Sequence, residues 1–187
     1  MTPDPALPGW GLTARLFHWG MAALVLFQAW LGVRAAFFTP DLGARFDLVQ
    51  RHKSWGALIL ALALARLAWR LARGRPPGHG PVWRRRLAGG VHATLYGLLL
   101  ALPLSGWVMV SAAPLQDLLG MRNMVFGLFA LPDPWVPGSE RVEALAATAH
   151  LWAAVVLAAA LALHVAGALW GQFGAKDHAL RRMILGR

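Results

Sequence analysis

The sequence contains no cysteine, a single tyrosine and only eight acidic residues among its 187 positions. Without cysteine the chain can form no disulfide bond, no thiolate zinc site and no iron–sulfur cluster held by cysteine. Any metal chemistry must therefore use histidine, carboxylate or methionine side chains. Charged residues make up 14% of the chain, whereas a typical soluble domain has about 25%. This low share argues against an ordinary soluble domain, and the 58% apolar content excludes intrinsic disorder.

Long stretches without charge are abundant. Three uncharged runs each hold at least 18 residues, at 16–33, 87–116 and 144–175. That length meets the roughly 18–20 residues needed to cross a hydrocarbon core. A fourth run is shorter and continues through Arg66, an intramembrane cation that needs an anionic partner. The fold class predicted is therefore all-α, an integral membrane four-helix bundle forming a single domain over residues 1–187, with helices at about 15–38, 52–73, 84–112 and 140–174.

The net charge of +10 suits either a nucleic acid or a membrane surface, and its placement favours the membrane. If the N-terminus is cytoplasmic, twelve of the 18 lysines and arginines flank the helices on that side with two acids, and six face outward with six acids. The positive-inside rule then places both termini in the cytoplasm. The stretch Thr2-Pro3-Asp4-Pro5 lacks the basic segment of a cleavable signal and the first apolar run is long enough to span, so we expect the first helix to stay as a signal anchor. Membrane lipid is the predicted partner, and no nucleic acid is expected.

Three connections join the predicted helices. The segment 39–50 contains proline and glycine turn signals and is predicted as an outer connection. The segment 74–81 is rich in glycine and proline and is predicted as a cytoplasmic loop. The apolar segment 118–131 is too short to span, so we expect a short helix or re-entrant turn that forms a lid in the outer interface.

Five of the seven histidines fall in or at the ends of these helices, at His18, His52, His92, His150 and His164. Ionisable residues inside membrane segments are rare and are candidates for function. Because successive helices alternate in direction, His52 and His150 lie toward the outside, and His18 and His92 toward the cytoplasm. His164 follows His150 by 14 residues, which places it about 21 Å deeper on the same helix face.

These depths pair the histidines as metal ligands. Neutral imidazole is a good iron ligand, and a haem held between two helices needs one histidine from each side at a common depth. His52 pairs with His150 at the outer level, and His164 pairs with either His18 or His92 at the inner level. Two such levels form the electron path that a two-haem membrane protein requires. The simpler interpretation is that these imidazoles only make hydrogen bonds between helices.

Three further charged or titratable side chains lie outside these pairs. Arg66 follows His52 by 14 residues and lies near the inner level, where a haem propionate would supply its anionic partner. The alternative for Arg66 is that its side chain extends to the lipid headgroups. His79 and His178 fall in cytoplasmic segments outside the bundle and are predicted to be solvated or lipid-facing.

Short motifs surround these histidines in a fixed order. They are Arg15-Leu16-Phe17-His18-Trp19, His52-Lys53-Ser54-Trp55-Gly56 with residues 66–71, His92-Ala93-Thr94-Leu95-Tyr96 with Leu102-Pro103-Leu104-Ser105-Gly106, His150, and residues 164–169 with the tail 176–183. Taken together over nearly the whole chain, they resemble the prokaryotic cytochrome b561 family, which is related to the di-haem cytochrome b subunits of hydrogenases and formate dehydrogenases.

The resemblance implies a set of cofactors and partners. Two haems b would be bound, the inner by His18 and His164 and the outer by His52 and His150. His92 would stay beside the inner haem, as an alternative ligand or as a contact for a quinone. The family includes members that oxidise superoxide at the outer face and reduce ubiquinone, and others that accept electrons from a redox partner protein. An oxidoreductase of the superoxide:quinone type in the bacterial inner membrane is therefore expected.

Two other functions stay open at this stage. The first is a haem-containing anchor and electron-transfer subunit of a larger dehydrogenase, which would co-purify with a soluble partner. The second is a haem-free transporter whose histidines and arginines line a proton or metal-ion path. A transporter would be colourless after purification, whereas both cytochrome functions require bound haem.

Overall fold

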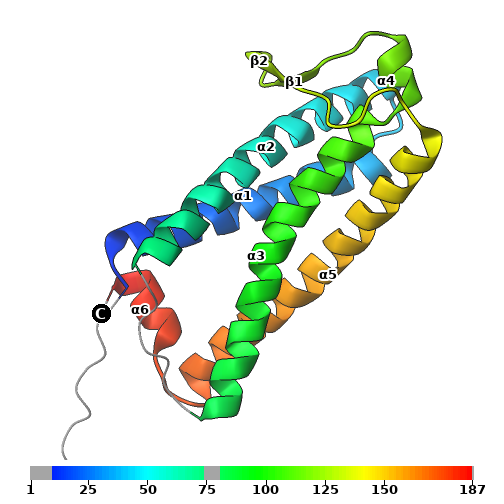
Figure 1. The fold of residues 1–187 in the computed structure, drawn as a ribbon. Helices are drawn as coiled ribbons and strands as arrows, with labels where there is room; N and C mark the ends of the chain where they lie inside the picture. The colour runs from blue at the N-terminus through cyan, green and yellow to red at the C-terminus, as the bar shows by residue number, and fades with distance from the viewer. Residues whose placement is uncertain (1–9, 74–80, 187) are drawn as a thin grey trace, which may run out of the picture.

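The structure, a computed structural model, describes residues 10–73 and 81–186, with the side chain of Asp117 excepted. Its main elements are four long helices, α1 (Leu12–Phe37), α2 (Leu42–Arg73), α3 (Val82–Ser111) and α5 (Glu140–Phe173). They run alternately up and down beside one another (Figure 1). Each of the four is long and apolar enough to cross a membrane, so the predicted four-helix bundle is confirmed. His79 and nearly all of the predicted loop at 74–81 lie outside the described residues.

Helix α2 begins about ten residues earlier than predicted, so the outer connection expected over 39–50 is wrong. The turn is confined to the residues between Phe37 and Leu42. The Asp41 carboxylate accepts a hydrogen bond from the backbone N–H of Ala44 at 2.7 Å. A carboxylate in that position caps a helix N-terminus, because it satisfies an N–H that has no partner inside the helix. The polar stretch after Asp41 is therefore the first part of α2.

The segment predicted as a short helix or re-entrant turn at 118–131 is instead largely a β-hairpin, so that expectation is also wrong. A short helix, α4 (Pro114–Leu118), leads into two antiparallel strands, β1 (Asn123–Val125) and β2 (Phe129–Leu131). The turn between the strands has positive φ at Phe126 (50°) and Gly127 (70°), and the Leu128 N–H bonds to the Val125 carbonyl at 2.9 Å. Two consecutive positive-φ positions form the turn that matches the twist of a hairpin.

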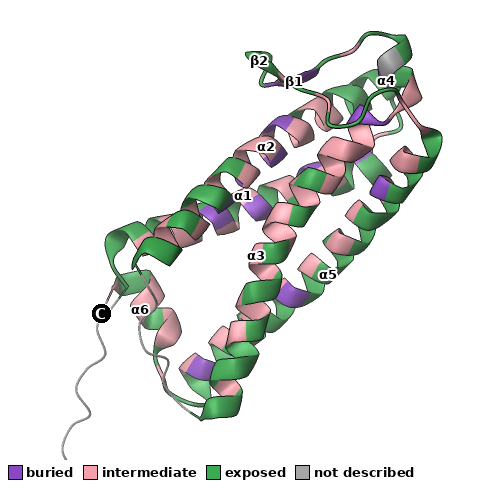
Figure 2. Ribbon diagram, viewed as in Figure 1, coloured by how far each residue is buried: buried purple, intermediate pink, exposed green. Residues whose placement is uncertain are grey.

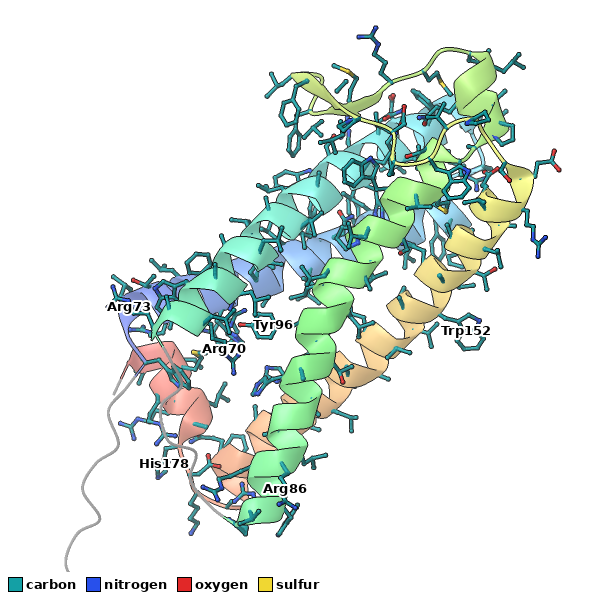
Figure 3. The ribbon with its side chains drawn as sticks, viewed as in Figure 1. Arg70, Arg73, Arg86, Tyr96, Trp152 and His178 are labelled. Atoms are coloured by element: carbon teal, nitrogen blue, oxygen red, sulfur yellow. The ribbon has the colours of Figure 1, made fainter. Side chains whose placement is uncertain are left out.

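The bundle packs mainly as two helix pairs. Helix α1 packs on α2 and α3 on α5, with α2 joining α3, whereas the described parts of α1 and α5 share no comparable contact. The buried cluster is small and centres on Met21, Ile59 and Ala63. Most outward-facing residues are exposed (Figure 2), and Trp152 points away from the bundle (Figure 3). Exposed apolar side chains on all four helices are what a lipid-facing surface requires.

The two ends of the bundle differ. One, here called the hairpin end, carries α4 and the hairpin, where the Phe126 N–H bonds to the Ser54 hydroxyl at 2.9 Å. The other, the α6 end, carries α6 (Ala179–Leu185), a short helix within the predicted basic tail. Trp19 of α1 donates to the Met183 carbonyl of α6 at 3.1 Å, and Arg84 of α3 pairs with Asp177 at 3.1 Å. These contacts tie the chain's end to α1 and α3 (Figure 1).

Candidate functional site

Two histidines from different helices face each other near the hairpin end. His52 of α2 and His150 of α5 have ring centroids 6.1 Å apart, with an angle of 76° between the ring planes. His52 is half-buried, as is His150. The structure therefore brings together the two residues that the sequence assigned to the outer level.

A second group of histidines lies toward the α6 end. His18 of α1 and His164 of α5 have ring centroids 6.0 Å apart, at an interplanar angle of 52°. His92 of α3 lies closer to His164, with centroids 5.2 Å apart and an angle of 67°. All three residues of the predicted inner level are thus neighbours, and His164 is the member common to both contacts.

The distances between these ring centroids can be compared with the distance expected between two imidazoles that bind the same metal. A metal–imidazole nitrogen bond is about 2.0–2.1 Å long and the ring centre lies about 1.1 Å behind the nitrogen, so two coaxial imidazoles on one metal have centres about 6.2 Å apart. The contacts of His52 with His150 (6.1 Å) and of His18 with His164 (6.0 Å) are close to this value. The His92 contact, at 5.2 Å, is an ångström shorter. Each of these two pairs supplies imidazole nitrogens from two helices at about the separation that a single haem iron requires.

No bare-metal site is found in the same region. Within residues 10–73 and 81–186, no group of three or more His, Cys, Asp or Glu side chains is arranged to hold a metal ion. A haem needs only two axial ligands from the protein, because the porphyrin supplies the other four. The histidine arrangement therefore fits a haem better than a structural or catalytic zinc site, which takes three or four protein ligands.

Glycines make room for both histidines at the hairpin end. A Cβ atom on Gly32 of α1 would lie 3.0 Å from Cε1 of His52, and one on Gly106 of α3 would lie 3.2 Å from Cε1 of His150. In addition, a Cβ on Gly56 of α2 would lie 3.1 Å from Nε2 of Gln28, which donates to the His52 carbonyl at 2.8 Å. Each imidazole thus lies directly against a neighbouring helix.

The His150 ring is held through one of its nitrogens. Its Nδ1 lies 3.0 Å from the Leu102 carbonyl and 3.1 Å from the Ser105 hydroxyl. The other nitrogen, Nε2, is left for a ligand. A metal-binding histidine usually donates its second ring N–H to a carbonyl in this way, which fixes the ring orientation.

Arg66 of α2 lies near His18 and His164 of the α6 end, and it shares the ring of Tyr96 with Arg70. Its guanidinium carbon is 5.6 Å from the ring centre of Tyr96, and that of Arg70 is 5.1 Å from the same ring (Figure 3). The structure shows an ion pair of Arg84 with Asp177, and among the described residues Arg66 forms no such pair with a carboxylate. A cation in a membrane segment without a protein anion can accept an anionic group from a ligand.

A cavity of about 260 Å³ lies at the hairpin end, and two of its lining residues, Gln50 and Lys53, are close to His52 in the sequence. Its polar lining comes from Gln50, Lys53, Gln116, Arg122 and Glu143, and the rest is apolar. Gln116 also donates to the Asp133 carboxylate at 3.1 Å, which ties α4 to the loop after the hairpin. This cavity was not predicted, because five of its lining residues come from the two segments, 39–50 and 118–131, whose structure was wrongly expected: Phe46, Val49, Gln50, Met121 and Arg122.

Three further residues of the site were not predicted as site residues. Tyr96, Gln28 and Ser105 are polar residues in apolar helices, and such a residue could have been marked as a candidate for an interhelical contact. His178, predicted to lie outside the bundle, is exposed at the start of α6 (Figure 3).

Two comparisons with known proteins found similar sequences. The family model described as prokaryotic cytochrome b561 matches residues 9–186. The Escherichia coli (strain K12) protein named cytochrome b561 homolog 2 is 28% identical over 178 residues, which are 94% of this chain and 90% of that protein.

Proposed function

Because the chain belongs to the prokaryotic cytochrome b561 family, we propose that it binds two haems b and carries electrons from a donor at the hairpin end to membrane quinone. Family membership and the four apolar helices make it a multi-pass protein of the bacterial inner membrane that binds haem b and takes part in electron transfer. The observation that supports two haems is the pair of matched histidine separations, 6.1 Å and 6.0 Å, at two levels of the bundle.

The axial ligands proposed are His52 with His150 at the hairpin end and His18 with His164 at the α6 end. Both separations are near the distance expected for two imidazoles on one metal, and each pair joins two helices. When bound, the haems supply the one-electron chemistry, and the protein fixes their ligands and surroundings. Their propionates would supply an anion for Arg66, which has no carboxylate partner among the described residues.

The α6 end is proposed to face the cytoplasm, and the hairpin end the periplasm. The α6 end carries Arg73 and Arg86 at the ends of α2 and α3 (Figure 3), together with Arg181 and Arg182 of α6. Lysine and arginine accumulate on the cytoplasmic side of membrane proteins. Both described ends of the chain lie at this face, which agrees with cytoplasmic termini.

Superoxide is the donor proposed for the hairpin end, with a periplasmic redox protein as the other possible donor. Lys53 and Arg122, which line the cavity there, provide positive charge for an anion. Two superoxide anions each give up one electron and leave as O₂, and one quinone takes both electrons and two protons to become quinol. His92, beside the α6-end pair, is proposed to contact the quinone.

The proposed activity can be tested with purified protein in liposomes that contain ubiquinone. Superoxide generated outside the liposomes is expected to cause quinol formation at a rate well above that of protein-free liposomes, and His150→Ala is expected to reduce that rate to the background. A protein that keeps its haems but forms no quinol, and that co-purifies with a soluble dehydrogenase, is instead an anchor subunit. A colourless protein that moves protons or metal ions is a transporter.

Arg66→Gln is expected to lower the midpoint potential of the α6-end haem by about 30–60 mV, equivalent to a three- to tenfold change in its ferric-to-ferrous equilibrium. Removing a nearby positive charge destabilises the reduced form of the haem, which carries one more electron, so its midpoint potential falls. Redox titration followed by optical absorption measures the change, with Arg66→Lys as the control that keeps the charge. An unchanged potential in Arg66→Gln would show that Arg66 does not contact that haem.

A further inference from the structure

Helix α3 holds one of the four proposed haem ligands through a carbonyl, a hydroxyl and a glycine. The Ser105 hydroxyl donates to the Leu102 carbonyl at 3.0 Å, and both groups lie against Nδ1 of His150, at 3.1 Å and 3.0 Å. Gly106 leaves the space for the ring, since a Cβ there would lie 3.3 Å from the same Nδ1. The carbonyl of Leu102, the hydroxyl of Ser105 and the backbone of Gly106 therefore all lie against one nitrogen of a residue on α5.

The chemistry of these groups fixes the position of the proton. A carbonyl oxygen can only accept a hydrogen bond, so the contact of Leu102 with Nδ1 requires a proton on Nδ1. The Ser105 proton is directed to the same carbonyl, so the hydroxyl oxygen can accept from Nδ1–H as well. Neutral imidazole carries one proton, and Nε2 of His150 is therefore the nitrogen with the free lone pair.

We propose that Ser105 is a positioning residue that fixes the tautomer and orientation of His150 and lowers the midpoint potential of the hairpin-end haem; this rests on the proposed ligation by His150. Acceptors on the second ring nitrogen raise the basicity of a metal-bound histidine. A more basic ligand stabilises ferric over ferrous iron, and the potential falls. Ser105 acts through His150 and does not itself reach the iron.

Among the described residues, these hydrogen-bond acceptors contact His150 and not its proposed partner ligand. The effect is therefore specific to one haem. Nδ1 of His52, the partner ligand, is buried and has no hydrogen-bond partner among the described residues. His18 and His164, at the other level, contact Ser105 in no described hydrogen bond, and His164 lies about 21 Å along α5 from His150. A change at Ser105 should therefore alter the hairpin-end haem alone.

The test is a redox titration of the purified, haem-loaded protein, followed by optical absorption and by electron paramagnetic resonance of the ferric haems. Ser105→Ala is expected to raise the midpoint potential of the hairpin-end haem by about 30–60 mV, a three- to tenfold change in its ferric-to-ferrous equilibrium. The shift is modest because the Leu102 carbonyl remains. The other haem is expected to keep its potential, and Ser105→Thr, which keeps the hydroxyl, to stay near the unmodified protein.

Ser111→Ala is the matched control. Ser111 lies on the same helix and is buried, but its hydroxyl donates only to the Trp107 carbonyl of its own helix, at 2.7 Å. Loss of the hairpin-end haem alone in Ser105→Ala, with normal haem content in Ser111→Ala, would also support the positioning role. An unchanged potential in Ser105→Ala, equal shifts in both haems, or the same shift in Ser111→Ala would overturn it.

The same experiment separates this inference from the function on which it rests. If His150→Ala keeps both haems, the proposed ligation is wrong whatever Ser105 does. If His150→Ala loses one haem and Ser105→Ala changes neither the potential nor the resonance signal of that haem, the ligation stands and the role of Ser105 is wrong.

Discussion

Replacement of His150 by alanine is expected to remove one of two haems from the protein and to leave the other in place. The His150 ring is 6.1 Å from that of His52 and far along α5 from His164, so only the hairpin-end haem would lose an axial ligand. His52→Ala is expected to remove the same haem. The haem content of the purified protein, measured by the pyridine haemochrome assay, should therefore fall from two haems per chain to about one in both variants.

The control for this pair is His178→Ala, because His178 is an exposed histidine outside the bundle. It is expected to keep the full haem content. The resonance signal that remains in His52→Ala should be the same as the one that remains in His150→Ala. Retention of both haems in either variant, or loss of different haems in the two, would contradict the pairing.

Replacement of His18 by alanine is expected to remove the α6-end haem, whereas His92→Ala is expected to keep it. The separation of His18 from His164 is 6.0 Å and matches that of the hairpin-end pair, while His92 lies 5.2 Å from His164, too close for two coaxial rings on one metal. The haem content and the low-spin resonance signals of the two variants measure the difference.

The two variants of the α6-end cluster also act as controls for each other, because both remove an imidazole next to His164. His92→Ala is expected to change quinone reduction while the haem spectrum stays that of the unmodified protein. The opposite pattern, with haem lost in His92→Ala and retained in His18→Ala, would make His92 the axial ligand.

The four helices and the histidine levels could be predicted from the sequence because they depend on one-dimensional quantities. The length of an uncharged run decides whether it can span a membrane, and 14 residues between His150 and His164 set both the depth and the face of the two rings. The helix predicted over 140–174 is confirmed almost to the residue by α5, Glu140–Phe173.

The parts that could not be predicted depend on contacts between segments distant in sequence, or on local backbone conformation. The early start of α2 depends on the Asp41 side chain capping the Ala44 N–H, and the hairpin depends on positive φ at Phe126, a residue that rarely adopts it. The roles of Ser105 and Gly106 became visible only when α5 was placed against α3. The 14-residue spacing from His52 predicted the level of Arg66, but only the structure brought Tyr96 beside it.

The most direct test of the central claim is a reduced-minus-oxidised absorption spectrum of the detergent-purified protein, combined with a pyridine haemochrome count per chain. Two haems b per polypeptide, low-spin in both redox states, are the result expected from two histidine pairs at 6.1 Å and 6.0 Å. A well-folded protein with a single haem would contradict the two-level arrangement, and one without haem would contradict the assignment of all four histidines as iron ligands.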